Sequence, residues 1–163
     1  MPQTLPINLC SHLINTSRAS LARTSLPYTQ SSLAITSLLL RHGFISSLTL
    51  GTPTHPSPID FASLPPPAKR LWVGLKHRNG QPVLRHMNLV SKPSVRIHVT
   101  RDELGRLLSG KRAKNVGGVG MGEVLIINVP KDASAGRTGR DTYMEGWEAW
   151  RAGLGGEIVC RAG

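Results

Sequence analysis

The sequence predicts an α+β protein of two small domains: an N-terminal αβαββ domain over residues 1–90 and a β-rich mixed C-terminal domain with short helices over residues 91–163. Three observations predict this fold. The chain has 163 residues, of which 39% are hydrophobic, so one medium or two small cores can form. Stretches with helical spacing of apolar residues are interleaved with stretches of strand-like alternation. A turn-prone Ser91-Lys92-Pro93 segment separates the two halves.

The first element is a short helix over residues 7–16. It follows Pro6, which is tolerated at the start of a helix, and its apolar residues have helical spacing. The residues predicted to be buried are Leu9, Leu13 and Ile14. Residues 19–29 then include one short strand.

A second helix follows, with Ser31 or Ser32 as its predicted N-cap and Gly43 as its predicted end. Residues 44–50 alternate as a strand. The segment 51–68 is rich in proline and has almost no periodicity, so we expect an exposed insertion in the N-terminal domain.

Residues 71–76 and 83–89 are β-like and flank Asn79-Gly80. Both turn residues tolerate positive φ, which makes this pair a strong hairpin signal. The sequence therefore predicts a hairpin of these two strands.

The C-terminal half begins with a predicted strand over residues 95–100. Asp102, Glu103 and Leu104 open a short helix, with the acids at its positive end. A basic loop over residues 109–115 and a glycine-rich connection lead to a strand at residues 124–128.

The end of the chain has an inserted polar loop over residues 129–140, a short helix around residues 145–151 and a closing strand over residues 158–161. Trp147 and Trp150 lie on one side of the helix, and Gly153 ends it. Two tryptophans three positions apart indicate a core or a protein interface in preference to base stacking.

The charge of the chain favours a polyanionic partner. Twenty Lys/Arg residues against nine Asp/Glu residues give a formal net charge of +11. Neutralising phosphates releases condensed counterions, so such a chain binds nucleic acid strongly, although histones and membrane-surface proteins share this property. The aromatic content of 4% disfavours serial base stacking on a single strand. We expect contacts to phosphates and to the shape of a folded nucleic acid.

The cysteines and the apolar runs bear on the compartment. Cys10 and Cys160 lack metal-type spacing, and we expect them to be buried free thiols in a reducing compartment. The longest apolar run, residues 33–40, is far shorter than the roughly 20 residues that span a bilayer. We therefore expect a soluble protein.

The first 59 residues contain no acid but hold arginines and many Ser/Thr residues, as in mitochondrial targeting segments. The first predicted helix begins near Ile7, so loss of a long presequence would destroy the fold. We expect import without cleavage, or with removal of only a few residues.

Several motifs occur in an order that is similar to one known family. The clearest is the run 152–160, AGLGGEIVC. The others are Leu13 with Asn15, the run 42–45, the run 90–97 (VSKPSVRI) and the helix start at Asp102. Together, over roughly residues 6–50, 69–128 and 141–161, the chain resembles the small-subunit ribosomal protein eight family in its mitochondrial form.

This resemblance implies an architectural protein of the mitochondrial small ribosomal subunit, in the mitochondrial matrix. Such a protein binds and stabilises small-subunit ribosomal RNA, contacts neighbouring ribosomal proteins, and supports subunit assembly and translation. The resemblance implies no cofactor, metal, catalytic residue, membrane partner or small-molecule substrate. A-form RNA hides its major groove, so we expect recognition through minor-groove shape, irregular loops and 2′-hydroxyls.

One departure affects the expected RNA contacts. Family members carry a Ser/Thr-rich RNA-binding loop after the penultimate core strand, where this chain has Asn128-Val129-Pro130-Lys131 and then the insertion. We expect amide and basic side chains to replace the hydroxyls. The complete set of expected RNA-binding residues is Asn15, Arg18, Ser31, Lys92, Arg96, His98, Lys111, Arg112, Lys114, Asn128, Lys131, Arg137, Arg140, Gly155 and Gly156.

Some alternatives stay open. Gly155 and Gly156 either bring the backbone close to RNA or form a structural turn, while Glu157 is expected to brace the protein. A stand-alone basic RNA-binding regulatory protein remains possible. A nucleic-acid-processing enzyme is less favoured, because the dispersed histidines and few acids suggest no acid/base or metal cluster.

Overall fold

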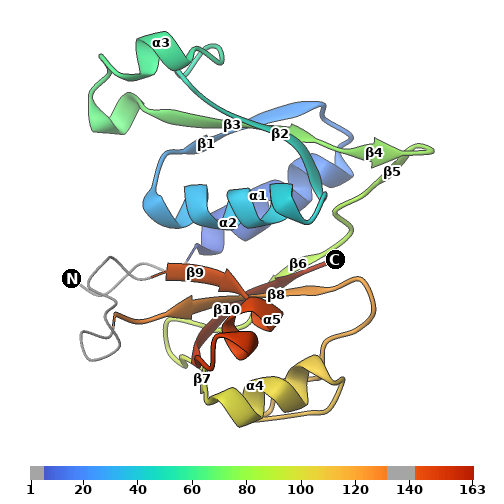
Figure 1. Ribbon diagram of the computed structural model, residues 1–163. Helices are drawn as coiled ribbons and strands as arrows, with labels where there is room; N and C mark the ends of the chain where they lie inside the picture. The colour runs from blue at the N-terminus through green and yellow to red at the C-terminus, as the bar shows by residue number, and fades with distance from the viewer. Residues whose placement is uncertain (1–5, 132–141) are drawn as a thin grey trace. The chain divides into compact units, whose positions relative to one another are not determined.

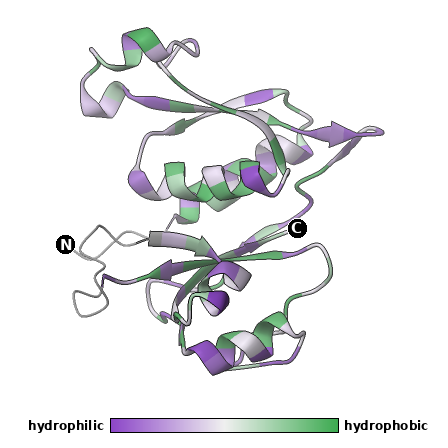
Figure 2. Ribbon diagram, in the orientation of Figure 1, coloured by the Kyte–Doolittle hydropathy of each residue, from purple (hydrophilic) through white to green (hydrophobic). Residues whose placement is uncertain are grey.

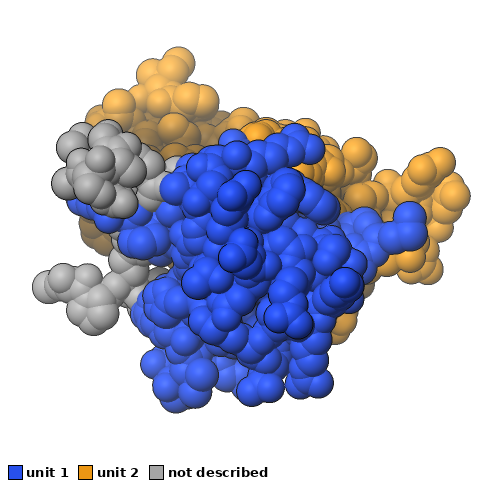
Figure 3. Space-filling view, turned by 60° about the horizontal axis from the view of Figure 1, so that its bottom comes forward, with its two compact units in different colours: residues 1–6, 88–163 blue, residues 7–87 orange. Residues whose placement is uncertain are grey.

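The computed structural model describes residues 6–131 and 142–163 and divides the chain into two compact units. The N-terminal unit is Ile7–Met87, and the C-terminal unit contains Asn88–Gly163; Figure 3 shows them in different colours. Each unit combines helices with its own main sheet, which confirms the α+β class. The division falls close to the predicted boundary at residue 90, and the status of each unit as an independent domain remains a prediction.

The N-terminal unit has the predicted αβαββ order in its main sheet and helices. Its elements are α1 (Ile7–Arg18), β1 (Arg23–Pro27), α2 (Gln30–Arg41), β2 (Ile45–Gly51), α3 (Pro58–Phe61), η1 (Pro66–Ala68), β3 (Arg70–Leu75), β4 (His77–Arg78) and β5 (Gln81–Pro82). The sheet order is β1-β3-β2, and both pairings are antiparallel.

One face of this sheet is covered by α1 and α2 (Figure 1). The side chains that form the core alternate with outward-facing ones along each strand, as expected for a sheet with one buried face. The fully buried residues include Leu13, Leu26, Ile35, Leu39 and Leu71. On the outer face, the register places Trp72 of β3 between Ser25 of β1 and Thr49 of β2.

The ends of α2 follow local hydrogen-bonding rules, with one correction. The prediction of Ser31 or Ser32 as N-cap is wrong: Thr29 is the N-cap, and its side chain accepts from the Ser32 N–H at 3.0 Å. Thr29 has an extended backbone, and its hydroxyl accepts from an N–H of the first helical turn that has no partner within the helix. The helix therefore begins before Ser31. Gly43, with φ of 77°, ends the helix as predicted.

The predicted hairpin of residues 71–76 and 83–89 is wrong. Both edges of β3 are occupied by β1 and β2, so β3 is the central strand. The Asn79-Gly80 turn exists, with φ of 51° and 73°, but it joins only the short strands β4 and β5. Strand β4 consists of two polar residues, His77 and Arg78, and Figure 2 draws it in the hydrophilic colour. The later residues supply β6 (Met87–Leu89), which belongs to the other sheet.

The C-terminal unit is built on a five-stranded sheet, in which β6-β10-β8-β9 follow in order and β7 also pairs with β10. Its further elements are β7 (His98–Val99), α4 (Arg101–Leu108), β8 (Val124–Val129), β9 (Thr142–Glu145), α5 (Gly146–Arg151) and β10 (Gly156–Ala162). The sequence did not predict β9, and the strand predicted over residues 95–100 is reduced to β7. Helix α5 and the closing strand confirm the predictions for residues 145–151 and 158–161.

The core of the C-terminal unit lies between one face of this sheet and the helices α4 and α5. It includes Leu104 and Leu107 of α4, Ala149 of α5, Ile127 of β8 and Ile158 of β10. Gly153, with φ of 75°, follows α5 as predicted. The opposite sheet face is therefore the place where polar residues of these strands project.

Two further predictions concern individual properties of the chain. Cys10 and Cys160 are buried and are not part of a disulfide among the described residues, as predicted. Among the described residues, no helix is both long and apolar enough to cross a membrane.

Candidate RNA interface

A polar row crosses the sheet of the C-terminal unit on the face away from α4 and α5. Glu157 of β10 pairs in register with His98 of β7 on one side and with Asn128 of β8 on the other. Asn128 in turn pairs with Tyr143 of β9. Directly opposed residues of antiparallel strands share one face, so these four side chains form a continuous row. Four strands, separated along the chain, thus each contribute one residue to the row.

The centre of this row is an acid neutralised by a predicted RNA-binding residue. Glu157 is buried, at 5% exposure. Arg96 Nη1 donates to Glu157 Oε1 at 3.2 Å and Oε2 at 3.1 Å. A buried carboxylate is stable only when it is paired, so Arg96 has a structural role. Glu157 braces the protein, as the sequence indicated.

The connection before β7 exposes Lys92 on a tight turn. The Lys92 N–H donates to the Val95 carbonyl at 2.9 Å, and the Val95 N–H donates to the Lys92 carbonyl at 3.1 Å. Buried Ser91 fixes the base of this turn, because its Oγ donates to the Ile158 carbonyl at 2.5 Å and accepts from the Ile97 N–H at 3.1 Å. These contacts explain why the strand predicted from residue 95 begins only at His98.

A second tight turn presents the predicted basic loop. Ala113 and Val116 are buried and form a two-bond antiparallel bridge, with N···O distances of 3.1 and 2.8 Å. Lys114 and Asn115 at the tip have positive φ, 44° and 63°. The cations around the bridge are exposed: Lys111, Arg112 and Lys114. The turn is therefore anchored in the core while its charges face solvent.

Lys114 connects this turn to β7 and to α4. Its Nζ donates to the His98 carbonyl at 2.7 Å and lies 3.1 Å from Glu103 Oε2. The Thr100 backbone N–H, with Lys114, lowers the pKa of the Glu103 carboxyl below its ordinary value. Thr100 and Glu103 form a reciprocal capping box at the start of α4.

The two glycines of the terminal motif are required by contacts within the protein. A Cβ on Gly155 would lie 2.4 Å from the Val99 carbonyl oxygen, and one on Gly156 would lie 2.5 Å from that of Asn128. No side chain fits at those distances. These contacts favour a structural turn over close approach to RNA, the two interpretations that the sequence left open.

The remaining predicted residues belong to other elements of the chain. Asn15 and Arg18 are exposed at the end of α1, and half-buried Ser31 lies in the first turn of α2, all in the N-terminal unit. Lys131 is exposed after β8. Arg137 and Arg140 lie outside the described residues.

The structure thus brings part of the predicted set together. Arg96, His98, Lys114, Asn128 and Gly156 lie around the row or contact one another through the bonds above. Tyr143 is a member of the row that the sequence did not single out. Its pairing with Asn128 crosses the insertion, so no local pattern could reveal it.

The two tryptophans of α5 have different surroundings. Their rings meet edge to face with centroids 5.8 Å apart. Trp150 packs against the core beside Gly105 of α4, whereas Trp147 is 43% exposed. Trp150 therefore confirms the core interpretation.

No three His, Cys, Asp or Glu side chains are grouped as metal ligands within residues 6–131 and 142–163.

The family model for Ribosomal protein S8 matches residues 7–121. The chain belongs to the ribosomal protein S8 family. The match spans α1 through the loop after α4, so the terminal run 152–160 lies outside it.

Relatives extend the S8 similarity over nearly the whole chain. Small ribosomal subunit protein uS8m of Neurospora crassa is 37% identical over 162 residues, covering 94% of both chains. The uS8m protein of Schizosaccharomyces pombe is 31% identical, covering 93% of this chain and 94% of that protein. Small ribosomal subunit protein uS8 of Shewanella sediminis is 26% identical, covering 94% of this chain and 92% of that protein.

Proposed function

We propose that this chain is a structural constituent of the mitochondrial small ribosomal subunit in the mitochondrial matrix. It binds and stabilises small-subunit ribosomal RNA and thereby supports subunit assembly and mitochondrial translation. The observation that carries this proposal is the end-to-end similarity to two proteins named uS8m, at 37% and 31% identity. Neighbouring ribosomal proteins are its other partners, and no reaction or cofactor is assigned to it.

The RNA contact is assigned to the surface of the C-terminal unit that holds Lys92, His98, Lys111, Arg112 and Lys114. The Lys and Arg residues lie on two turns whose backbone is anchored, and His98 lies on β7, an edge strand of the sheet, so binding need not order the backbone of a loop. Cations of this kind neutralise phosphates and set the position of the protein on a helix. Arg96 contributes indirectly to RNA binding: it pairs with Glu157, so this carboxylate is neutralised and kept out of the exposed surface.

The remaining residues of the predicted set belong to the same proposal, some as peripheral contacts and some as structural support. They are Asn15, Arg18, Ser31, Asn128, Lys131, Arg137, Arg140, Gly155 and Gly156. Gly155 and Gly156 act through the turn that they permit, and Asn128, which is buried, acts by building the sheet row.

Gradient sedimentation of mitochondrial lysate, with crosslinking and sequencing of the attached RNA, tests the proposal. The chain should migrate with the small subunit and crosslink to one contiguous region of its ribosomal RNA. A chain that stays at the top of the gradient contradicts the ribosomal assignment. Scattered messenger RNAs among the crosslinks would instead identify a stand-alone regulatory RNA-binding protein.

A further inference from the structure

Most of the net positive charge of the chain lies in the N-terminal unit, which holds few of the predicted RNA contacts. Residues 7–87 contain a single acid, Asp60, against eight basic residues. These are Arg18, Arg23, Arg41, Lys69, Arg70, Lys76, Arg78 and Arg85. Residues 88–163 contain twelve basic residues but also eight acids. The N-terminal unit therefore carries the larger share of the net charge, which calls for an anionic partner of its own.

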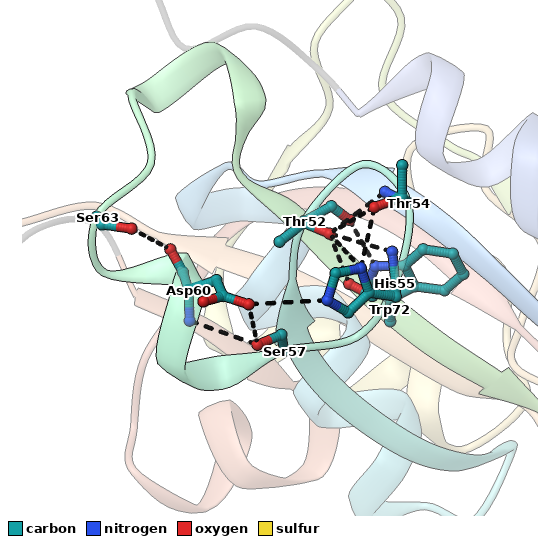
Figure 4. Close-up of polar contacts among 7 residues, drawn as sticks. All are labelled: Thr52, Thr54, His55, Ser57, Asp60, Ser63 and Trp72. Atoms are coloured by element: carbon teal, nitrogen blue, oxygen red, sulfur yellow. Dashed lines mark hydrogen bonds and ion pairs between the residues drawn. The ribbon is translucent and has the colours of Figure 1, made fainter.

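The proline-rich segment is largely exposed, as the sequence predicted, but it contains α3 and η1, and its start is hydrogen-bonded to the sheet. Trp72 Nε1 donates to the Thr52 carbonyl at 2.9 Å, which ties the start of the segment to β3 (Figure 4). The Thr52 hydroxyl closes a turn with His55, and it accepts from the His55 N–H at 3.1 Å. Gly51 permits this approach, since a Cβ there would lie 2.7 Å from the Trp72 ring.

The far end of the segment is anchored by a cap and by aromatic contacts. Ser57 caps α3, and its hydroxyl donates to Asp60 Oδ2 at 2.7 Å. The rings of Phe61 and Tyr28 meet edge to face, with their centroids 5.0 Å apart. Lys69 Nζ lies over the Phe61 ring, 4.8 Å from its centroid. With both ends fixed and φ restricted at each proline, Pro56 and Pro58 form a stiff wall beside the sheet.

Between this wall and the outer sheet face lies a pocket of about 300 Å³. The lining residues are Arg23, Ser47, Thr49, Pro56, Pro58, Trp72, Val73 and Gly74. The lining combines a flat aromatic ring and proline rings with two hydroxyls and one cation. Its size is at the lower end of small-molecule sites, which span about 300–1,000 Å³.

The electrostatics of this pocket suit a phosphate. Arg23 is exposed and has no ion-pair partner in the described part of the chain. Asp60, the single acid of the unit, is already engaged by Ser57 and lies 3.7 Å from His55 Nε2. An anion at the pocket mouth thus meets a cation without a competing carboxylate.

We propose that this pocket binds one unpaired nucleotide of RNA, with the base against Trp72 and the phosphate on Arg23. A base presents a π-face to an aromatic ring, and such stacking is tolerant of sequence. The hydroxyls of Ser47 and Thr49 are positioned to accept or donate at the base edge or the ribose. This inference rests on the proposed function, because it assigns a second RNA contact to the same chain.

Short-wavelength ultraviolet crosslinking of intact small subunits, followed by nuclease and trypsin digestion and mass spectrometry, tests this contact. Cleavage after Arg70 and Lys76 releases residues 71–76, in which Trp72 is the only aromatic residue. We expect a nucleotide adduct on this peptide. The inference is overturned if this peptide is unmodified in subunits whose copies of the chain carry adducts elsewhere. It is also overturned if a crosslinker joins Lys69 to a neighbouring protein while Trp72 stays unmodified.

Two matched variants separate the pocket from general charge. Arg23→Gln should lower the yield of the Trp72 adduct by about tenfold, the effect of losing one charge-assisted contact. Arg78→Gln removes the same charge from the exposed β4–β5 hairpin and should leave the yield unchanged. Equal losses in both variants overturn the pocket assignment. If the chain is absent from small subunits altogether, the proposed function itself fails, which is a separate result.

Discussion

The Arg96–Glu157 pair gives a residue that was predicted to bind RNA a contact within the protein itself. Glu157 exposes 6% of its side chain and Arg96 exposes 32%. Removal of the cation leaves a buried carboxylate without its ion-pair partner. We expect Arg96→Gln to lower the free energy of unfolding by about 2 kcal/mol, measured by denaturant titration of the free protein.

A matched variant and a double variant decide this prediction. Arg106→Gln removes an equal charge from an exposed position of α4 and should leave stability within about 0.5 kcal/mol. Arg96→Gln combined with Glu157→Gln should recover part of the loss. An Arg96→Gln variant as stable as wild type would indicate that Arg96 acts only toward RNA.

The glycines of the terminal turn allow a second residue-scale prediction. A Cβ at Gly156 meets the Asn128 carbonyl oxygen at 2.5 Å, whereas one at Gly117 has only Arg161 Nη1 at 4.0 Å. We expect Gly156→Ala to cost about 1–3 kcal/mol by forcing β10 and β8 apart, and Gly117→Ala to be tolerated. Thermal unfolding of the free proteins measures both. A stable Gly156→Ala protein that binds RNA poorly would support the RNA-packing interpretation instead.

For single residues, the sequence indicated what a side chain can do but not which other residues it contacts. Glu157 was expected to brace the protein because a carboxylate beside RNA is unfavourable. Arg96 was not recognised as its partner, since the two are 61 positions apart and meet only through the pairing of β7 with β10. Trp72 was missed because a tryptophan within an alternating strand has no local pattern that distinguishes a pocket wall from an ordinary outward-facing residue.

The start of α4 is the element whose stability depends most clearly on pH. The Thr100 N–H and Lys114 hold the pKa of Glu103 below its ordinary value of 4.5. A group whose folded-state pKa is depressed stabilises the fold above its unfolded pKa, and this contribution is lost as pH falls through the folded pKa. We expect Glu103→Gln to lower the melting temperature near pH 7, with the difference from wild type narrowing below pH 4.5.

Asp102 provides the control for this experiment. It lies in the same helical turn but has no ion pair among the described residues. Asp102→Asn should therefore show a smaller effect than Glu103→Gln at neutral pH. A difference between wild type and Glu103→Gln that grows as the solution is acidified would contradict the assigned role of the capping box.

Element order was predictable because it depends on local patterns, while strand pairing was not. Helical spacing identified α1 and α2, and the Asn79-Gly80 turn was located correctly. The partners of that turn were misjudged, because the alternation of β3 is equally compatible with a hairpin and with a central strand. The fixed turn at Lys92–Val95 likewise shortened β7 through a side chain, Ser91, whose partner is distant in sequence.

For the whole molecule, the buried face of α1 constrains how the protein can be processed. Leu9, Cys10, Leu13 and Ile14 are all buried in the N-terminal unit. Loss of one large buried apolar side chain costs about 2–5 kcal/mol, so loss of the set exceeds the stability of a small domain. We expect mass spectrometry of the mitochondrial protein to find a mature N-terminus before Leu9. A mature N-terminus beyond residue 15 would contradict this.

The distribution of charge over the whole chain predicts how binding responds to salt. Each phosphate that is neutralised adds about one to the slope of log affinity against log salt concentration. Lys111 and Arg112 are held by the turn closed at Ala113 and Val116, so the pair of changes Lys111→Gln and Arg112→Gln should reduce this slope by about two. Filter binding of the full chain to mitochondrial small-subunit ribosomal RNA over a salt series measures it.

The matched pair Arg78→Gln and Arg151→Gln separates direct contact from the general field. It removes the same charge from exposed positions in the β4–β5 hairpin and in the last turn of α5, outside the proposed interface. Direct phosphate contact requires the slope to fall only for the turn variant, since exposed charges that make no contact act only through a field that is screened within about 8–10 Å at physiological salt. Equal reductions for both pairs would mean that the turn contributes only to a diffuse positive field, and the phosphate contacts would then have to lie elsewhere on the chain.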